Sequence, residues 1–470
     1  MSLSAPAPGA ALADWLAYLE TLHPKAIDLG LDRIRAVAQR LALSLDCTKI
    51  TVAGTNGKGS TCAMLESMLL AAGYKVGKYT SPHLLRFNER IRVNGEDASD
   101  EAIVAQFERI QSVLGQTTLT YFEMSTLAAL LLFQASQLDV VVLEVGLGGR
   151  LDAVNLIDTD CAILTSVDLD HMQYLGDTRE AIGLEKAHVF RAGKPAICAD
   201  PVPPQSVIDH AAAIGADLWR VGVDFNYSGD RQQWAYGGRT QRRNALGYPA
   251  LRGANQLLNA SAALAALEAL RDHLVVTQQD VRQGLLHVSL PGRMQILPGL
   301  PATILDVGHN PHAISALGQN LDSMGHYPHT YAVVGMLNDK DIEATLSRLA
   351  QRVDRWLCAT LSGPRGTSAQ ELAAIVRRIS GSRTPPDSFI AHSQEITRPT
   401  TAHKPGVRPA PRPAIAARDV QVSTFDSPEQ AFAEARRLAG DNDRILVFGS
   451  FATVGPVLDV LRREGRDVLS

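Results

Sequence analysis

Apolar residues in the first 200 positions fall into two kinds of segment that alternate along the chain. Residues 50–52 and 139–144 are short runs of apolar and β-branched residues with the length of strands, whereas residues 122–137 are very apolar and have the length of a helix. Strands that are apolar throughout are typical of a parallel sheet covered on both faces. The alternation therefore predicts an α/β domain with a doubly wound, mainly parallel sheet.

The other segments of this part follow the same alternation. We expect strands at residues 76–80, 161–166 and 195–198, and helices at residues 12–22, 32–43, 61–70, 100–113, 178–190 and 255–273. Aromatic residues and glycines in residues 222–249 predict a small antiparallel meander on the rim.

A second alternating set begins after the turn at residues 290–293. Strands are expected at residues 302–307, 331–334, 356–360 and 444–448, and helices at residues 339–349, 368–379, 428–438 and 453–463. This pattern predicts a smaller Rossmann-like domain, so we place the two domains at residues 1–290 and 291–470. Residues 398–418 are dense in Pro, Ala and Arg and predict an exposed, disordered or polyproline-like insertion.

The first predicted strand runs into a turn with three glycines, Gly54, Gly57 and Gly59, followed by a predicted helix. Strand, glycine loop and helix in this order can bind phosphate, because backbone N–H groups and the helix N-terminus face the anion. Lys58 can reach the outer phosphates and the Ser60 hydroxyl can bind Mg²⁺. The spacing departs from the standard P-loop, since Gly54 is followed by only two residues before the next Gly-Lys pair. The alternative is an ordinary glycine turn with an exposed lysine.

Four predicted strands end in polar or glycine-rich loops, at Gly54, Ser81, Glu144 and Asp168. Because ligands bind outside the carboxyl ends of parallel strands, one shared site is expected there. A buried carboxylate at Glu144 needs a partner, which is either Mg²⁺ or a salt bridge to Arg150 or a lysine.

Five further polar residues have both a functional and an ordinary interpretation. His171 is either a ligand of the same ion or a structural residue, since Mg²⁺ prefers oxygen. Spacing alone does not set Lys186 apart from any solvated lysine on a helix. Asp306 and His309 with Arg293 either contact a nucleotide or an anionic substrate across a cleft between the domains, or are ordinary polar loop residues.

Composition narrows the class of protein. A net charge of −4 over 470 residues gives no basic signal, so nucleic acid is not an expected partner. The five cysteines are scattered without metal spacing, which indicates a reducing compartment. The first residues lack a signal peptide, and the longest strong apolar run, residues 127–133, is too short to cross a bilayer. We therefore expect a cytoplasmic protein with no membrane partner.

Nine short motifs follow one another along nearly the whole chain. They are Gly54-Thr-Asn-Gly-Lys-Gly-Ser60, Thr80-Ser-Pro-His83, Thr120-Tyr-Phe-Glu123, Leu143-Glu-Val-Gly-Leu-Gly-Gly-Arg-Leu-Asp152, Leu169-Asp-His171, Glu185-Lys-Ala187, Leu290-Pro-Gly-Arg293, Asp306-Val-Gly-His-Asn-Pro311 and Gly335-Met-Leu-Asn-Asp-Lys340. Together they resemble the folylpolyglutamate synthase and dihydrofolate synthase family, a branch of the Mur ligase-like ATP-dependent amide ligases. Two departures are small: Asn255 stands where many members have a histidine, and the insertion is longer than usual.

The resemblance implies roles for particular residues. The implied ATP contacts are Gly57, Lys58, Gly59, Ser60, Asn259, Arg293 and Asp306. The implied Mg²⁺ ligands are Ser60, Ser81, Glu144 and His171. The implied substrate contacts are Leu29, Gly30 and Leu31 for dihydropteroate, and Thr120, Tyr121, Phe122, Glu123, Leu151, Asp152 and Ala153 for the pterin. The implied catalytic residues are Lys58, His309 and Lys186, the last carried as a carbamate.

The resemblance also implies the reaction. ATP, one or two Mg²⁺ ions and, as an option, a monovalent cation would support ligation of L-glutamate to dihydropteroate and to the glutamate tail of reduced folates, through an acyl phosphate. We expect a monomer with small-molecule substrates. The alternatives are an enzyme with only one of the two activities, a Mur-type peptide ligase, and a nucleotide switch that joins no substrates; motifs 120–123 and 290–293 argue against the peptide ligase.

Overall fold

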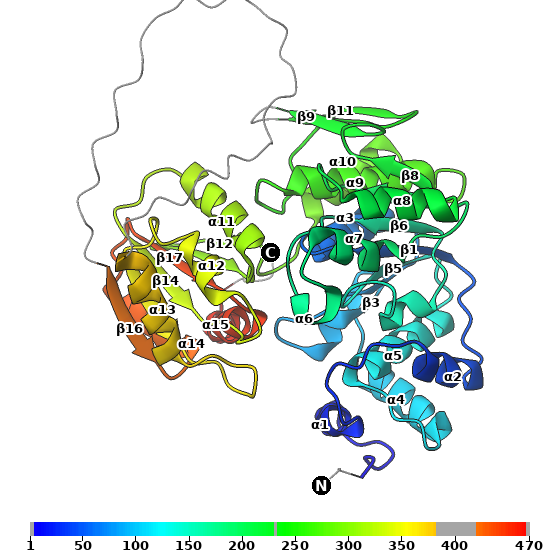
Figure 1. Ribbon diagram of the computed structural model, residues 1–470, viewed down its shortest axis with the longest axis horizontal. Coiled ribbons are helices and arrows are strands. Elements are labelled where there is room, and N and C mark those ends of the chain that lie inside the picture. Colours follow the sequence, from blue (N-terminus) through cyan, green and yellow to red (C-terminus); the bar gives the residue numbers. More distant parts are fainter. Residues whose placement is uncertain (1–3, 230–232, 382–419, 467–470) are drawn as a thin grey trace, which may run out of the picture.

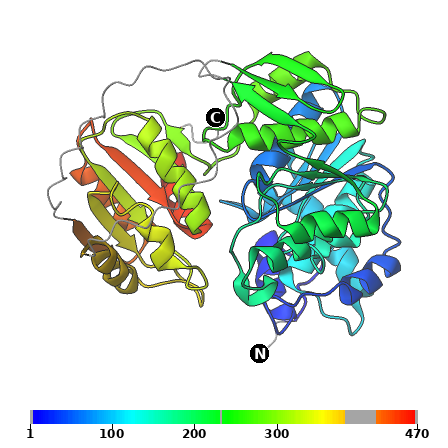
Figure 2. The same ribbon diagram turned by 45° about the horizontal axis from the view of Figure 1, so that its top comes forward.

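Two β-sheets divide the chain into two lobes that lie side by side (Figures 1 and 2). The structure is a computed structural model and describes residues 4–229, 233–381 and 420–466. Within these residues the first sheet has eight strands in the order β4-β3-β2-β5-β1-β6-β7-β8, and the second has six in the order β12-β13-β17-β14-β15-β16. Both sheets are mainly parallel, so the predicted doubly wound fold and the smaller Rossmann-like fold are confirmed.

The first lobe alternates strands and helices as predicted. Its strands are β1 Thr48–Ala53, β2 Val76–Tyr79, β3 Ile91–Val93, β4 Glu96–Asp97, β5 Val140–Glu144, β6 Cys161–Leu164, β7 Pro195–Cys198 and β8 Asp217–Arg220. Its helices are α1 Leu12–Leu22, α2 Asp32–Arg40, α3 Lys58–Ala71, η1 Phe87–Arg90, α4 Asp100–Leu114, α5 Tyr121–Ala135, η2 Ala153–Leu156, α6 Met172–Leu175, α7 Arg179–Ala187, α8 Gln205–Ile214, α9 Gln256–Ala269 and α10 Gln278–His287. The rim meander is β9 Asn226–Gly229, β10 Trp234–Gly237 and β11 Arg242–Leu246, with antiparallel pairing as expected.

The second lobe contains the remaining elements. Its strands are β12 Gln295–Leu297, β13 Ala302–Asp306, β14 Thr330–Val334, β15 Arg355–Ala359, β16 Gln421–Phe425 and β17 Arg444–Phe448. Its helices are α11 Pro311–Ser323, α12 Ile342–Ser347, α13 Ala369–Gly381, α14 Pro428–Leu438 and α15 Phe451–Arg463. Helices α11 and α15 face the larger lobe (Figure 1).

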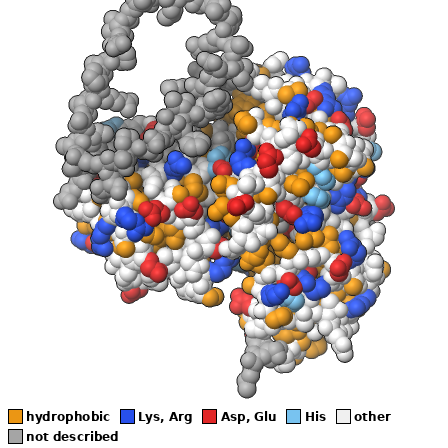
Figure 3. All heavy atoms as spheres, in the orientation of Figure 1, with side chains coloured by type: hydrophobic (Ala, Val, Ile, Leu, Met, Phe, Trp, Pro, Cys, Tyr) orange, Lys and Arg blue, Asp and Glu red, His pale blue; other side chains and the backbone are white. Residues whose placement is uncertain are grey.

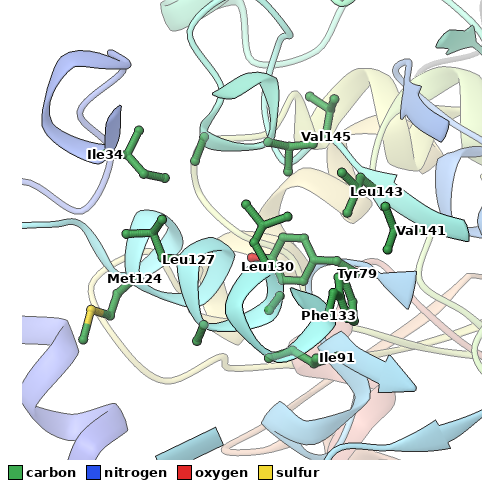
Figure 4. Packing of buried hydrophobic residues seen from close by; sticks show 14 of the residues in the cluster. Ile34, Tyr79, Ile91, Met124, Leu127, Leu130, Phe133, Val141, Leu143 and Val145 are labelled. Atoms are coloured by element: carbon green, nitrogen blue, oxygen red, sulfur yellow. The ribbon is translucent and has the colours of Figure 1, made fainter. Parts of the chain in front are cut away.

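Alternate residues of the central strand β5 belong to different hydrophobic clusters. Val141 and Leu143 pack with helices α1, α2, α4 and α5, whereas Val140 and Val142 pack with α3, α9 and α10. Figure 4 shows the first cluster, with Leu130 of α5 beside the ring of Tyr79 from β2. Both faces of the sheet are therefore covered, which explains why its strands are apolar throughout.

Several predicted boundaries differ from the structure for local reasons. Helix α2 ends at Arg40, three residues early, because Ala42 takes a left-handed backbone conformation with φ of 50°. Helix α12 starts only at Ile342, where the Asp341 side chain accepts a hydrogen bond from the Ala344 N–H. The structure also contains elements that were not predicted: helices α6, α8, α10, α11, η1 and η2, and strands β3, β4, β8, β12 and β16. The insertion predicted at residues 398–418 lies outside the described residues.

Candidate active site

The glycine turn, residues 54–60, connects β1 to α3 at the carboxyl edge of the first sheet. Gly57, with φ of 89°, precedes the first residue of α3, and Gly54 has φ of 145°. A Cβ atom on Gly57 would lie 2.5 Å from Oδ1 of Asn259, and one on Gly54 would lie 1.9 Å from Oγ1 of Thr165. Only glycine fits at both positions, so the turn is a cradle of backbone amides at the N-terminus of a 14-residue helix.

The neighbouring loop after β6 holds the glycine turn in place. Thr55 N–H donates to the Ser166 carbonyl (2.8 Å), and the Thr165 hydroxyl donates to the Asn56 carbonyl (2.7 Å). Lys58 folds back over the turn, where its Nζ donates to the carbonyls of Gly54 (3.0 Å) and Thr55 (3.3 Å). The cradle is thus organised by the protein itself.

Glu144, at the end of β5, lies beside the glycine turn. Its Oε2 accepts a hydrogen bond from the Ser81 N–H (3.1 Å) and lies 3.9 Å from the position a Cβ would take on Gly59. Burial raises the pKa of Glu144, an effect that nearby Lys58 opposes. The predicted alternative of a salt bridge to Arg150 is wrong, because Arg150 pairs with Glu185 at 2.8 Å.

The oxygen donors around Glu144 suit Mg²⁺. Ser60 follows Gly59 in the turn, and its hydroxyl oxygen lies 3.5 Å from the side-chain amide nitrogen of Gln256. Serine hydroxyls and a carboxylate are the hard oxygen ligands that this ion prefers. Among the described residues no group of three or more His, Cys, Asp or Glu is placed to hold a metal.

The three residues expected to reach ATP from the seam between the lobes lie near the glycine turn. Asn259, on α9, backs Gly57, and Arg293 Nη2 lies 3.9 Å from the Cβ position of Gly59. Arg293 also stacks on the Phe451 ring at 4.9 Å. Asp306 fixes the strand that follows Arg293, since it accepts the Met294 N–H at 2.9 Å. The structure therefore brings the seven predicted ATP contacts to one region.

Lys186, on α7, is buried and its Nζ donates to the Gly54 carbonyl at 3.2 Å. Burial lowers its pKa to about 7, and the positive charge of Lys58 acts in the same direction. The sequence predicted nothing special here from spacing alone, yet the structure makes this amine largely neutral at slightly alkaline pH. A neutral amine is the form that reacts with CO₂.

His171 and His309 approach one carboxylate, Asp170, from the two lobes. Lys340 Nζ lies 2.7 Å from Asp170 Oδ1 and 3.2 Å from His171 Nε2, and His309 Nε2 lies 3.9 Å from Asp170 Oδ2. Burial lowers the pKa of both histidines to about 4, so both rings are neutral at pH 7. Burial alone would raise the pKa of Asp170, but Lys340 holds it well below its usual range. A neutral imidazole can donate a lone pair to a metal or accept a proton.

A second polar contact joins the lobes at the glycine turn. Asn56 Nδ2 donates to Asn310 Oδ1 (3.3 Å), and Asn310 Nδ2 donates back to Asn56 Oδ1 (3.1 Å) and to Asp170 Oδ2 (3.0 Å). Asn310 also caps α11, because its Oδ1 accepts the Ala313 N–H. The start of α11 is therefore fixed directly against the phosphate cradle.

An apolar contact joins the lobes on another side of the seam. Leu84 and Leu85, in the loop that begins at Ser81, pack against the apolar cluster of α14 and α15. The Leu84 carbonyl oxygen would lie 2.3 Å from a Cβ on Gly455, so α15 needs a glycine there. A cavity of about 850 Å³ adjoins this contact and is lined by both lobes, Leu84 and Leu458 among its residues.

A cavity of about 250 Å³, here called the loop cavity, lies beside Ser81. Its lining residues are Ala26, Ile27, Asp28, Leu29, Gly30, Ser81, Pro82, Arg90, Thr120, Phe122, Glu123, Gly146, Leu147, Leu151, Asp152, Ala153, His171 and Arg365. Eight of the ten predicted substrate contacts are among them. Leu31 and Tyr121 are not, and both pack against the core instead.

Some residues of the loop cavity also have structural roles. Thr120 and Glu123 form a capping box at the start of α5. Asp152 caps η2 through the Val154 N–H at 3.0 Å, and burial raises its pKa to about 6. Arg33 joins the cavity loop to α5 by pairing with Asp28 and Glu123. These residues thus stabilise the wall of the loop cavity, and some of them also line it.

The sequence did not single out four residues that the structure places in the site: Arg90, Asp170, Lys340 and Arg365. Asp170 and Lys340 stand inside quoted motifs, which was a usable signal. Arg90 and Arg365 lie outside every motif and reach the loop cavity only through the tertiary fold.

Comparison with known proteins matches this arrangement. Residues 52–267 match the Mur ligase middle domain, and residues 292–451 match the Mur ligase, glutamate ligase domain. The chain is 43% identical to the dihydrofolate synthase/folylpolyglutamate synthase of Escherichia coli (strain K12), with 98% of each chain covered. It is 39% identical to the protein of that name from Haemophilus influenzae, with 97% of this chain and 98% of that one covered.

Solved structures are similar to this chain over nearly its whole length. E. coli FolC in complex with DHPP and ADP superposes with a TM-score of 0.86, at 43% identity, and covers 98% of this chain and 100% of its own. A bifunctional folylpolyglutamate synthase/dihydrofolate synthase with Mn, AMPPNP and L-glutamate bound gives a TM-score of 0.82, at 42% identity, and covers 98% of this chain and 100% of its own.

Proposed function

The chain belongs to the dihydrofolate synthase/folylpolyglutamate synthase family of Mur ligases, and we propose that the glycine turn, Glu144 and the loop cavity together form its ligation site. The enzyme joins L-glutamate to dihydropteroate, and to the glutamate tail of folates, at the expense of ATP. One observation carries the proposed placement: Ser81 lines the loop cavity and also donates to Glu144 beside the phosphate cradle. An acid held in the cavity would therefore reach the end of a triphosphate.

A carboxylate is a poor acyl donor, because its leaving group would be oxide. The acceptor carboxylate attacks the γ-phosphate of ATP, the bond between the γ-phosphorus and the bridging oxygen breaks, and ADP leaves with that electron pair. The glutamate amine then attacks the acyl carbon, phosphate leaves, and the amine loses a proton. Amides of the glycine turn and Lys58 would hold the phosphates and offset the charge that develops on them.

Ser60, Ser81 and Glu144, with His171, would hold Mg²⁺. When bound, the ion would neutralise phosphate charge at the reacting end of the nucleotide. The neutral His171 ring suits a ligand, although its Nε2 lies 3.2 Å from Lys340 Nζ, so Lys340 would have to move aside. A carbamate on Lys186 would turn a cation into a carboxylate beside Gly54, and a second cation would then find an oxygen ligand there.

His309 and Lys340 would bind the incoming glutamate. Both belong to the second lobe, and both face Asp170 of the first. Lys340 offers a cation for a glutamate carboxylate, and the neutral ring of His309 can accept a proton from the amine. Contact between the lobes would exclude water, which would otherwise hydrolyse the acyl phosphate.

The decisive experiment measures ADP formation with each substrate omitted in turn. We expect turnover to require an acceptor, either dihydropteroate or tetrahydrofolate, and L-glutamate as well. Equal ADP release without acceptor would overturn the ligase assignment. A Glu144→Gln variant should lose at least about 100-fold in kcat, and extra Mg²⁺ should recover part of it. Equal turnover of E144Q and wild type would overturn the placement of the metal.

We also propose a cytoplasmic monomer, with the domain boundary between residues 290 and 291. No helix in the described part of the chain is long and apolar enough to span a bilayer. On the face drawn in Figure 3, acidic and basic side chains are interspersed, which suits small substrates better than nucleic acid. Light scattering at micromolar concentration would show a mass near 50.5 kDa for the monomer.

A further inference from the structure

Arg365 reaches the loop cavity from the opposite lobe. It lies in the loop after β15, whereas the other lining residues of the cavity belong to the first lobe. No motif contains it, and the proposed mechanism assigns it no role. Its guanidinium group stands on the side of the cavity where the lobes meet, close in space to the residues around Lys340.

The backbone at Arg365 is fixed to the segment that carries Lys340. The Asn338 N–H donates to the Arg365 carbonyl (2.8 Å), Leu337 forms a β-bridge with Gly366, and the Thr367 N–H donates to the Met336 carbonyl (3.1 Å). Lys340 in turn contacts Asp170 of the first lobe. Arg365 is therefore presented to the cavity by two loops that hold each other, as specific recognition requires.

The Arg365 side chain is also held in one orientation. Its Nη2 and Nε donate to the two oxygens of Asp339 at 2.8 and 3.3 Å. The side chain of Arg365 is 53% exposed, and an ion pair at that exposure stabilises a fold by no more than about 1 kcal/mol. Stability therefore does not account for the arrangement. Within the described residues Nη1 makes no hydrogen bond, so the outer edge of the guanidinium fork can bind a second carboxylate.

The two acceptors differ in what they would offer to that edge. Dihydropteroate carries one carboxylate, which is the group that reacts. A folate ends in glutamate and carries two, of which one reacts and the other does not. A volume of about 250 Å³ is below the range of about 300–1,000 Å³ usual for ligand sites. The cavity would therefore hold the ring end, and the tail would lie at the edge near Ser81, His171 and Arg365.

We infer that Arg365 binds the non-reacting carboxylate of the terminal glutamate of a folate, and so favours the polyglutamylation step over dihydrofolate synthesis. A partly buried carboxylate needs a cation or hydrogen-bond donors. The Nη1 edge of Arg365 supplies both, while Asp339 keeps the fork in place. The inference rests on the proposed function and names the feature of the substrate that separates its two reactions.

The test compares Arg365→Gln and Arg365→Lys with wild type on both acceptors. For R365Q we expect kcat/KM with tetrahydrofolate to fall about 10- to 100-fold, mainly through the KM of the acceptor, since a charge-assisted hydrogen bond is lost. Activity with dihydropteroate should stay within about threefold of wild type. R365K should fall between R365Q and wild type on tetrahydrofolate, because it keeps the charge but not the fork.

Arg378→Gln is the matched control. Arg378, on α13, is 54% exposed and pairs through its fork with Glu343, but does not line the cavity. The R378Q variant should carry out both reactions at the wild-type level. Equal losses of R365Q on both acceptors, a rise only in the KM of L-glutamate, or no change would overturn the inference. A wild-type enzyme inactive with tetrahydrofolate would overturn the proposed second activity, and the inference with it.

Discussion

Asn56 and Asn310 exchange two side-chain hydrogen bonds across the seam between the lobes, at 3.3 and 3.1 Å. Asn56 belongs to the phosphate cradle, and Asn310 starts the helix that follows the His309 loop. Each amide thus fixes the orientation of the other. This reciprocal pair joins the phosphate cradle to the loop of His309, which is proposed to bind glutamate. Such a pair contributes little to overall stability, about 0.5–1.5 kcal/mol per bond, so its main effect should be on geometry.

The first prediction separates this pair from the helix cap. Asn310→Ser keeps a good capping residue but loses the amide that reaches Asn56. We expect the free energy of unfolding to fall by less than about 1.5 kcal/mol and kcat to fall about tenfold or more. Denaturant unfolding and steady-state ADP release measure the two effects. Asn310→Ala should lose about 1 kcal/mol more, through the cap. Wild-type kcat in N310S would show that the pair does not position the lobes.

The second prediction concerns the buried amine of Lys186. With a pKa of about 7, about 90% of it is neutral at pH 8, against well under 1% for an ordinary lysine. We expect ¹³C-labelled bicarbonate to give a carbamate signal that grows between pH 6 and 8, and turnover to fall after CO₂ is removed. Lys186→Gln should abolish the signal. Lys194→Gln is the control, since Lys194 is a surface residue paired with Asp160, and it should keep the signal. A signal that persists in K186Q would contradict the carbamate assignment.

The third prediction concerns stability at mildly acidic pH. The folded pKa of His309 is about 4, below the unfolded value of about 6.5, so the unfolded chain binds the extra proton first. The free energy of unfolding should therefore fall as the pH drops from 6.5 to 4, by up to about 3 kcal/mol for this group, and His171 should add a similar amount. Asp170, whose pKa is lowered, costs stability only as the pH falls below about 4.

Urea unfolding at half-unit pH steps measures this slope. His309→Gln should reduce it by about 1.4 kcal/mol per pH unit between pH 6 and 4.5. An unchanged slope in H309Q would show that the ring is not buried as a neutral group.

The fourth prediction uses the close approach of Leu84 to Gly455. In Gly455→Ala the new methyl group would lie 2.3 Å from the Leu84 carbonyl oxygen, so backbone must shift. We expect a loss of about 1–3 kcal/mol in stability and a higher Mg²⁺ requirement, because Ser81 is in the displaced loop. Gly318→Ala is the matched control within a helix. Its methyl group would meet only a flexible arginine side chain at 3.4 Å, so it should be neutral or slightly stabilising. Equal behaviour of the two variants would contradict the argument.

The sequence predicted the central strands of both sheets because each is a continuous apolar run buried on two faces. Strand β16 was missed for the opposite reason: Gln421–Phe425 is polar and lies at the edge of its sheet. Helix α11 starts with Asn310 and Pro311, a capping signal that was available but not used.

The residues of the candidate site also differ in how far the sequence can predict them. Residues on the cradle and at strand ends were predictable, because their backbone geometry follows from local sequence. The substrate role of Tyr121 stays a prediction: its ring contacts that of Phe87, and it is not among the residues that line the loop cavity. Arg365 could not be found, since its place depends on how two lobes meet. Sequence patterns describe single elements well and the junction between lobes poorly.

The seam between the lobes has a polar side and an apolar side. Amides, a lysine and histidines meet at the cradle, whereas the partly buried Leu84 and Leu85 pack against the apolar cluster of α14 and α15. Water can hydrogen-bond to the polar groups once they separate, but it cannot replace the apolar contact of the two leucines. We therefore expect the two lobes to rotate about the contact of Leu84 and Leu85. The seam would open at the cradle and release ADP and product, while the leucine contact persists.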